Sequence, residues 1–93
     1  MNFTKESAAY AAIDDLAKRL NVAADDVTVT NIEDREFPNS ALGAPTSGEM
    51  AAMMMSDGWE FELSADDETY IYRADDQQLR LVGYNGENII VAQ

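Results

Sequence analysis

Apolar residues recur at helical spacing near the start of the chain, and this pattern predicts one amphipathic helix over residues 4–20. Thr4 is expected to cap its N-terminus, with the acidic Glu6 in the first turn. Asn21 suits a left-handed residue just beyond the last turn. The apolar positions are Ala9, Ala12, Ile13, Leu16, Ala17 and Leu20, and the opposite face carries Asp14, Asp15, Lys18 and Arg19.

After the helix the pattern changes to the alternation that is typical of strands. Trp59, Phe61 and Leu63 alternate with two glutamates, so one face of that strand is apolar. The pair Asn85-Gly86 predicts a tight hairpin, because both central positions of a type I′ turn need a positive φ. The predicted strands cover about residues 27–32, 59–64, 69–73, 79–84 and 87–92.

This order of elements predicts a single α+β domain over residues 1–93. We expect one helix on one face of an antiparallel, roughly five-stranded sheet, which is a two-layer sandwich. A long ordered loop over residues 33–58 should separate the first two strands. The last strand, residues 87–92, is expected at a sheet edge, where it could pair between chains, so we expect a monomer or a weak dimer.

The negative net charge of the chain disfavours some classes of binding partner. Its 93 residues include 18 acidic and six basic side chains, for a net charge of −12. Phosphate binding needs clustered lysine and arginine, so nucleic acid and anionic membrane surfaces are disfavoured. No apolar run is long enough to span a membrane, and residues 1–12 do not resemble a signal peptide. The acidic surface either simply keeps the protein soluble or reflects adaptation to high salt.

The chain lacks the usual chemistry of an active site. It has no cysteine and no histidine, which removes the commonest general base and the commonest metal ligands. Its serines therefore have no activating base, and its aspartate pairs lack the alternating spacing of a calcium loop. Weak cation binding is the alternative to ordinary turn aspartates. We expect no enzyme activity, no metal site and no cofactor.

Two further groups of side chains could form binding surfaces. Trp59, Phe61, Tyr70 and Tyr72 are aromatic, but their alternation along strands favours a place in the core. Three consecutive methionines, Met53 to Met55, follow Met50 in the long loop. Adjacent methionines of an extended segment cannot all point inward, so they either anchor the loop or form an adaptable contact surface for a partner.

The same loop contains a motif. The stretch "FPNSALGAPTSGEM", from Phe37 to Met50, combines two prolines with two glycines. The chain resembles a widespread family of small bacterial domains that are commonly exported or attached to lipoproteins. That family has an aromatic-Pro-Asp-x-Ser-Leu-Gly-Cys-Pro-x-Pro-Gly-Met loop, a preceding Leu-Ala-x-Arg-Leu helix and a later Tyr-x-Tyr-His strand. The matching residues here are "LAKRL" (16–20), the loop motif and "YIYR" (70–73).

The resemblance implies an extracytoplasmic protein whose loop is tied to the sheet. The residues themselves, without a signal peptide, equally allow a cytoplasmic location. In the family a loop cysteine and a second cysteine in the last strand look like a disulfide, but these positions fall on Ala44 and about Val82 here. Both replacements are apolar and could pack together. We expect the loop to be held across the domain at Phe37, Leu42, Pro45 and Met50.

Ordered long loops on a rigid scaffold are commonly functional, so the sequence favours a non-catalytic protein-binding domain. One form is a protease-inhibitor-like domain that presents residues 40–44, or the methionines, to a partner's cleft. The alternatives are a PepSY-like structural or modulatory accessory domain, and a surface-associated domain of a halophile with no discrete ligand. The candidate binding residues are Phe37, Ser40, Leu42, Gly43, Pro45, Met50, Met53, Met54 and Met55.

Overall fold

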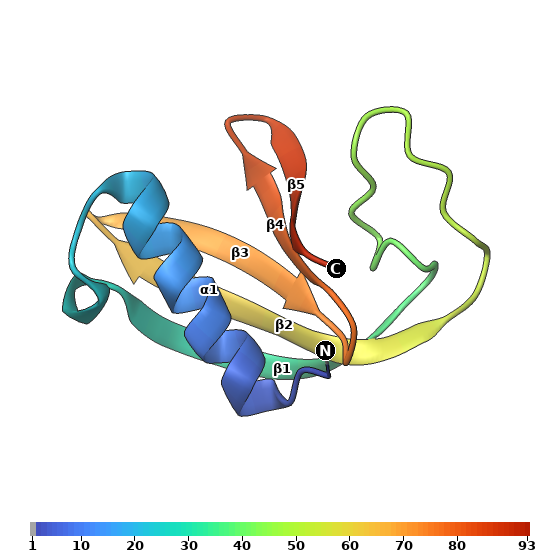
Figure 1. Cartoon of the computed structure of the whole chain (residues 1–93), viewed down its shortest axis with the longest axis horizontal. Coiled ribbons are helices and arrows are strands. Elements are labelled where there is room, and N and C mark those ends of the chain that lie inside the picture. Colours follow the sequence, from blue (N-terminus) through green and yellow to red (C-terminus); the bar gives the residue numbers. More distant parts are fainter. Residues whose placement is uncertain (1) are drawn as a thin grey trace.

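The computed structural model describes residues 2–93 and has the expected α+β architecture, with one helix packed on a five-stranded sheet (Figure 1). The strands are antiparallel and follow the order β1-β2-β3-β4-β5, so β1 and β5 form the two edges. The elements are α1 (Lys5–Leu20), the short 3-10 helix η1 (Ala24–Asp26), β1 (Thr28–Phe37), β2 (Ser56–Ala65), β3 (Glu68–Ala74), β4 (Leu79–Tyr84) and β5 (Glu87–Ala92).

Both ends of α1 are capped by local side chains or backbone geometry, as the sequence predicts. The Ser7 N–H donates to Thr4 Oγ1 at 3.1 Å, and the Thr4 N–H donates to Ser7 Oγ at 2.9 Å. Asn21 has a φ of 56° and a ψ of 48°, which is the left-handed conformation that ends many helices. These caps satisfy backbone groups that the helix itself leaves without partners.

The core lies between α1 and one face of the sheet. Phe61 and Leu63 of β2 alternate with outward glutamates, and Tyr72 of β3 lies beside Phe61 in the register. The Tyr72 hydroxyl donates to Asp15 Oδ2 of α1 at 2.7 Å, so the buried ring has a partner for its polar atom. The buried core cluster comprises Phe3, Ala8, Ala12, Leu16, Ala17, Val27, Phe61, Leu63, Ala65, Tyr72, Ala74, Leu79 and Leu81.

The predicted boundaries of the first two strands are wrong. Residues 33–37 continue β1, and Ser56 to Gly58 begin β2, with Phe37 opposite Ser56 in the register. The connection between these strands therefore covers residues 38–55, instead of 33–58. The sequence gives no alternation there because β1 is an edge strand, whose side chains are almost all exposed. Pairing with β2, and not burial, makes this segment a strand.

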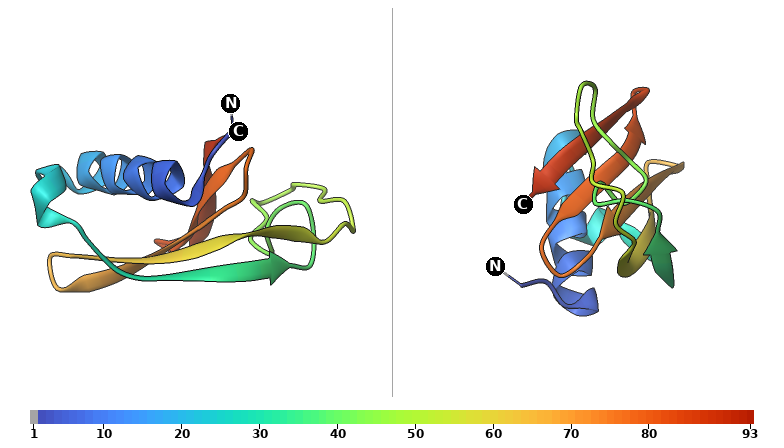
Figure 2. Two further views of the ribbon diagram at one scale, coloured as in Figure 1. Left: turned by 90° about the horizontal axis from the view of Figure 1, so that it is seen from below. Right: turned by 90° about the vertical axis from the view of Figure 1, so that its right-hand side faces the viewer.

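The sheet is strongly twisted, so that the β4–β5 hairpin turns away from the other strands. In two views the hairpin stands between α1 and the β1–β2 connection, which is residues 38–55 (Figures 1 and 2). The connection therefore covers the side of the hairpin that faces away from the helix. Within residues 2–93, α1 is too short and too polar to cross a membrane.

Candidate functional site: the β1–β2 connection

The face of the sheet opposite α1 carries a row of charged side chains. Glu60 of β2 pairs in register with Arg73 of β3, and Arg73 pairs with Arg80 of β4. Each of these residues lies between two neighbours that point into the helix-side core, so the strand alternation directs it to the other face. The β1–β2 connection folds over this row.

Arg80 is the central anchor of the connection. It is only 1% exposed, and its guanidinium donates two parallel hydrogen bonds to Glu49, from Nη1 to Oε1 at 2.5 Å and from Nη2 to Oε2 at 2.6 Å. Its Nη1 also donates to the Ala44 carbonyl at 3.2 Å, and its Nε donates to Gln78 Oε1 at 2.7 Å. This planar fork geometry suits arginine and not lysine.

Glu49 in turn organises the backbone beside it. Its Oε1 accepts a hydrogen bond from the Thr46 N–H at 2.9 Å, while its own N–H donates to the Thr46 carbonyl at 3.1 Å. The hydrogen bonds from Arg80, and then the one from the Thr46 backbone, lower the pKa of Glu49 to about 2. The carboxylate is therefore ionised at any ordinary pH, as the ion pair requires.

Arg73 holds an earlier part of the connection. Its Nη1 donates to the Leu42 carbonyl at 2.9 Å, and its Nε donates to Glu60 Oε1 at 3.0 Å. Its guanidinium also lies over the Phe37 ring, 5.3 Å from the ring centroid, at a distance that permits a cation–π interaction. Leu42 is completely buried although its φ is 58°. Residues with a Cβ atom adopt this left-handed conformation only at an energetic cost.

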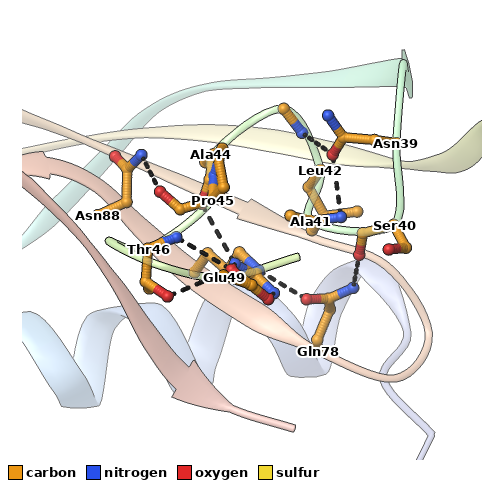
Figure 3. A network of polar contacts seen from close by, with 12 residues as sticks. Asn39, Ser40, Ala41, Leu42, Ala44, Pro45, Thr46, Glu49, Gln78 and Asn88 are labelled. Atoms are coloured by element: carbon orange, nitrogen blue, oxygen red, sulfur yellow. Dashed lines mark hydrogen bonds and ion pairs between the residues drawn. The ribbon is translucent and has the colours of Figure 1, made fainter. Parts of the chain in front are cut away.

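The side-chain amides of Asn39, Gln78 and Asn88 bond further backbone groups of this turn (Figure 3). Asn39 Oδ1 accepts from the N–H groups of Ala41 and Gly43, both at 3.0 Å. Gln78 Nε2 donates to the Ser40 carbonyl at 2.7 Å, and Asn88 Nδ2 donates to the Pro45 carbonyl at 2.9 Å. Residues 39–49, which we call the anchored turn, are thus bonded to β3, β4, β5 and the β3–β4 turn.

In contrast to the anchored turn, the residues that follow it are exposed to solvent. Residues 50–55, "MAAMMM", which we call the methionine segment, have no strand or helix structure and point four thioethers into solvent. Met50 is 96% exposed, Met53 90%, Met54 66% and Met55 64%. The segment is nevertheless tied to the anchored turn, because the Ser40 N–H donates to the Ala52 carbonyl at 2.9 Å and the Ala52 N–H donates to Ser40 Oγ at 2.8 Å.

The candidate binding residues from the sequence fall into a buried group and an exposed group. Phe37 and Leu42 are buried, as the expected anchoring requires, while Ser40 is half-buried and Gly43 is exposed. Pro45 is exposed but is held through its carbonyl, which accepts from Asn88. The expectation that Met50 also holds the loop is wrong, since it is exposed. The alternative in which the methionines anchor the loop is likewise wrong.

The sequence interpretation missed the side chains that do the anchoring. They are Glu49, Arg73, Gln78, Arg80 and Asn88. One signal was present: Arg80 interrupts an apolar strand between Leu79 and Leu81. Its guanidinium donates to the carbonyl of Ala44, which is completely buried.

A second surface feature lies on the far side of α1. A hollow of about 250 Å³ runs between α1 and β1 and is lined by apolar side chains with Lys5 and Glu6 at one end. Tyr10 is 71% exposed and Ile32 is 38% exposed beside it. We call this the helix flank, and it comprises Lys5, Glu6, Ala9, Tyr10, Ile13, Val29 and Ile32.

Across residues 2–93 the carboxylates do not gather in a group of three or more that could hold a metal ion.

Comparisons with known proteins identify the family of this domain. No curated protein and no solved structure matches the chain. A family model matches residues 9–82, a span that includes most of α1, the entire β1–β2 connection and the anchoring residues Arg73, Gln78 and Arg80. The chain therefore belongs to the family described as a domain of unknown function, DUF8738.

Proposed function

We propose that this chain is a non-catalytic protein-binding domain that presents the methionine segment to a partner. The observation that carries the proposal is the contrast within one connection: four thioether side chains are 64–96% exposed, directly after a turn whose carbonyls and carboxylate are bonded to the sheet. Isolated exposed apolar residues are common on proteins, but four within six positions form a patch.

The proposed advantage for binding is that a rigid anchored turn carries the flexible side chains of the methionine segment. Binding is weakened by the entropy lost when a loop becomes ordered, and the anchored turn has already lost that entropy. Methionine side chains are unbranched and polarisable, so they fit partner surfaces of different shape. Met53, Met54 and Met55 therefore offer apolar area that a partner can cover without reordering the backbone beneath.

A protease-inhibitor-like role is the most concrete form of this proposal. Of the two stretches considered from the sequence, residues 40–44 suit it less well, because the carbonyls of Ser40, Leu42 and Ala44 accept hydrogen bonds from the sheet and its turn. A protease cleft needs extended backbone that is free to pair with the enzyme. In the methionine segment the hydrogen bonds to Ser40 engage the backbone of Ala52, whereas the flanking methionines are exposed, so this stretch supports the role better.

The test is a stoichiometric titration against a panel of serine proteases and metalloproteases, with the intact mass of the domain followed throughout. We expect saturable inhibition with the chain uncut, and we expect the variant Met53→Glu/Met54→Glu to lose it. A matched control, Ser47→Glu, adds a charge to the same connection at an exposed position and should keep it. Cleavage within residues 50–55 without inhibition would contradict the inhibitor role.

The helix flank favours a second candidate, a PepSY-like accessory module that packs on a larger protein. Tyr10 and Ile32 are exposed beside an apolar hollow, as such a docking face requires. The two candidate functions predict that different substitutions abolish the binding of an identified partner. Binding through the methionine segment is lost in Met53→Glu/Met54→Glu, whereas binding through the helix flank is lost in Tyr10→Glu.

A further inference from the structure

We propose that the methionine segment binds one soft monovalent cation, Cu(I), through the thioether sulfurs of Met50, Met53, Met54 and Met55. This activity goes beyond protein binding and requires no partner chain. It also involves no redox step, because the metal is bound and released as Cu(I).

The first argument is the distribution of soft donor atoms. The chain contains five methionines, and four of them fall within residues 50–55. There is no cysteine thiol and no histidine imidazole anywhere in the sequence, so thioethers are its strongest ligands for a soft metal. Thioethers select Cu(I) over hard divalent ions, which prefer oxygen ligands.

The second argument is accessibility and reach. All four side chains are at least 64% exposed, so no packing has to be broken before their sulfurs meet an ion. A chain extends at most about 3.6 Å per residue, so the Cα atoms of Met53 and Met55 lie within about 7 Å of one another. Each side chain has three rotatable bonds, which allows several sulfurs to converge on one ion.

The third argument is the setting of the segment. One backbone–backbone and one backbone–side-chain hydrogen bond between Ser40 and Ala52 fix its middle, and the Glu49–Arg80 ion pair fixes the residue before Met50. The ordering cost of bringing the donors together is thereby reduced. The net charge of −12 attracts cations to the surface in general, and the sulfurs then select the soft ones.

The decisive variant separates this proposal from protein binding. Replacing all four residues, as Met50→Leu/Met53→Leu/Met54→Leu/Met55→Leu, keeps an apolar patch of similar volume but removes every sulfur of the segment. This variant should retain a hydrophobic partner and lose the metal. Met53→Glu/Met54→Glu should lose the partner and also weaken metal binding. Failure of one proposal therefore leaves the other measurable.

The experiment uses Ag(I) as a redox-stable probe of the Cu(I) site, in chloride-free buffer, with ¹³C-methyl-labelled methionine followed by NMR and native mass spectrometry. We expect the methyl resonances of the segment to shift together and saturate at one equivalent of Ag(I). In the tetra-leucine variant, which keeps Met1, binding should weaken at least tenfold. Anaerobic titration with Cu(I) should give the same stoichiometry, and excess Mg²⁺ should not displace the ion.

Three results would overturn the proposal. They are the absence of saturable binding, equal binding by the tetra-leucine variant, and displacement of Ag(I) by Mg²⁺, which would indicate carboxylate binding instead. Because the four side chains are exposed, the variant is expected to fold, and its circular dichroism spectrum and thermal midpoint would verify this.

Discussion

Arg80 of β4 and Glu49 of the β1–β2 connection form a bidentate ion pair across a sequence separation of 31 residues. The arginine is 1% exposed, whereas the glutamate side chain keeps 20% of its exposure. A buried guanidinium is costly to desolvate, so its hydrogen bonds to Glu49, Ala44 and Gln78 all have to be present. The pair therefore couples the order of the connection to the integrity of the sheet.

Glu49→Gln should destabilise the protein by about 2–3 kcal/mol, because Arg80 stays buried and loses its charge partner. The free energy of unfolding from urea titration measures this. Glu87→Gln, at an exposed position of β5, is the matched control and should change stability by less than about 0.5 kcal/mol. Equal effects of the two substitutions would show that the ion pair contributes nothing specific.

The same pair predicts a pH dependence of stability. The pKa of Glu49 is lowered from 4.5 to about 2 in the folded state, chiefly by Arg80. The unfolded state therefore binds the proton more readily, and the contribution of Glu49 is complete above pH 4.5 and is lost as the pH falls towards 2. Unfolding curves at pH 2 to 6 should show a steeper decline for the wild type than for Glu49→Gln. Parallel pH profiles would contradict the assignment.

Gly58→Ala should cost about 3 kcal/mol or more, because an added Cβ would lie 2.1 Å from the Ala74 carbonyl oxygen. Gly48→Ala is the matched comparison: its φ is 79°, but nothing lies within 4 Å of the added carbon. That change should cost only about 1–2 kcal/mol, from the left-handed backbone alone. Thermal midpoints of the two variants test the order, and a Gly48 variant as unstable as the Gly58 variant would refute it.

Tyr72→Phe should destabilise the domain by about 1.5 kcal/mol, because it removes the hydrogen bond from the buried hydroxyl to Asp15. The loss stays moderate because Asp15 keeps its hydrogen bond from Arg19 Nε at 2.7 Å. Tyr10→Phe, on a ring that is 71% exposed, should have no measurable effect in the same unfolding assay. An unchanged free energy of unfolding in Tyr72→Phe would mean that this hydrogen bond adds no net stability.

Salt should stabilise this domain. The net charge of −12 disfavours the compact state through self-repulsion, and raising the ionic strength from 0.1 M to 1 M shortens the screening length from about 10 Å to about 3 Å. The unfolding midpoint should therefore rise with potassium chloride. A flat or falling midpoint would argue against the high-salt interpretation of the acidic surface.

Elements with local signals can be predicted from the amino-acid sequence alone. The caps at Thr4 and Asn21 and the hairpin turn at Asn85-Gly86 depend on backbone geometry within a few residues, and all are present. The apolar face of Trp59, Phe61 and Leu63 follows from alternation alone, and it lies against the core. These signals are sufficient to predict the helix, the strands after residue 58 and the two-layer fold.

The arrangement of the β1–β2 connection, in contrast, depends on contacts between distant parts of the chain. Residues 33–37 are a strand because β2 pairs with them, although their own side chains face solvent. Arg80 and Glu49 are partners because the sheet twist brings the β4–β5 hairpin beneath the connection, and nothing local to either residue indicates the other. Met50 is exposed although the adjacent Glu49 is bonded to Arg80. The burial of a side chain depends on contacts that are distant in sequence, and a periodic pattern along one segment does not contain them.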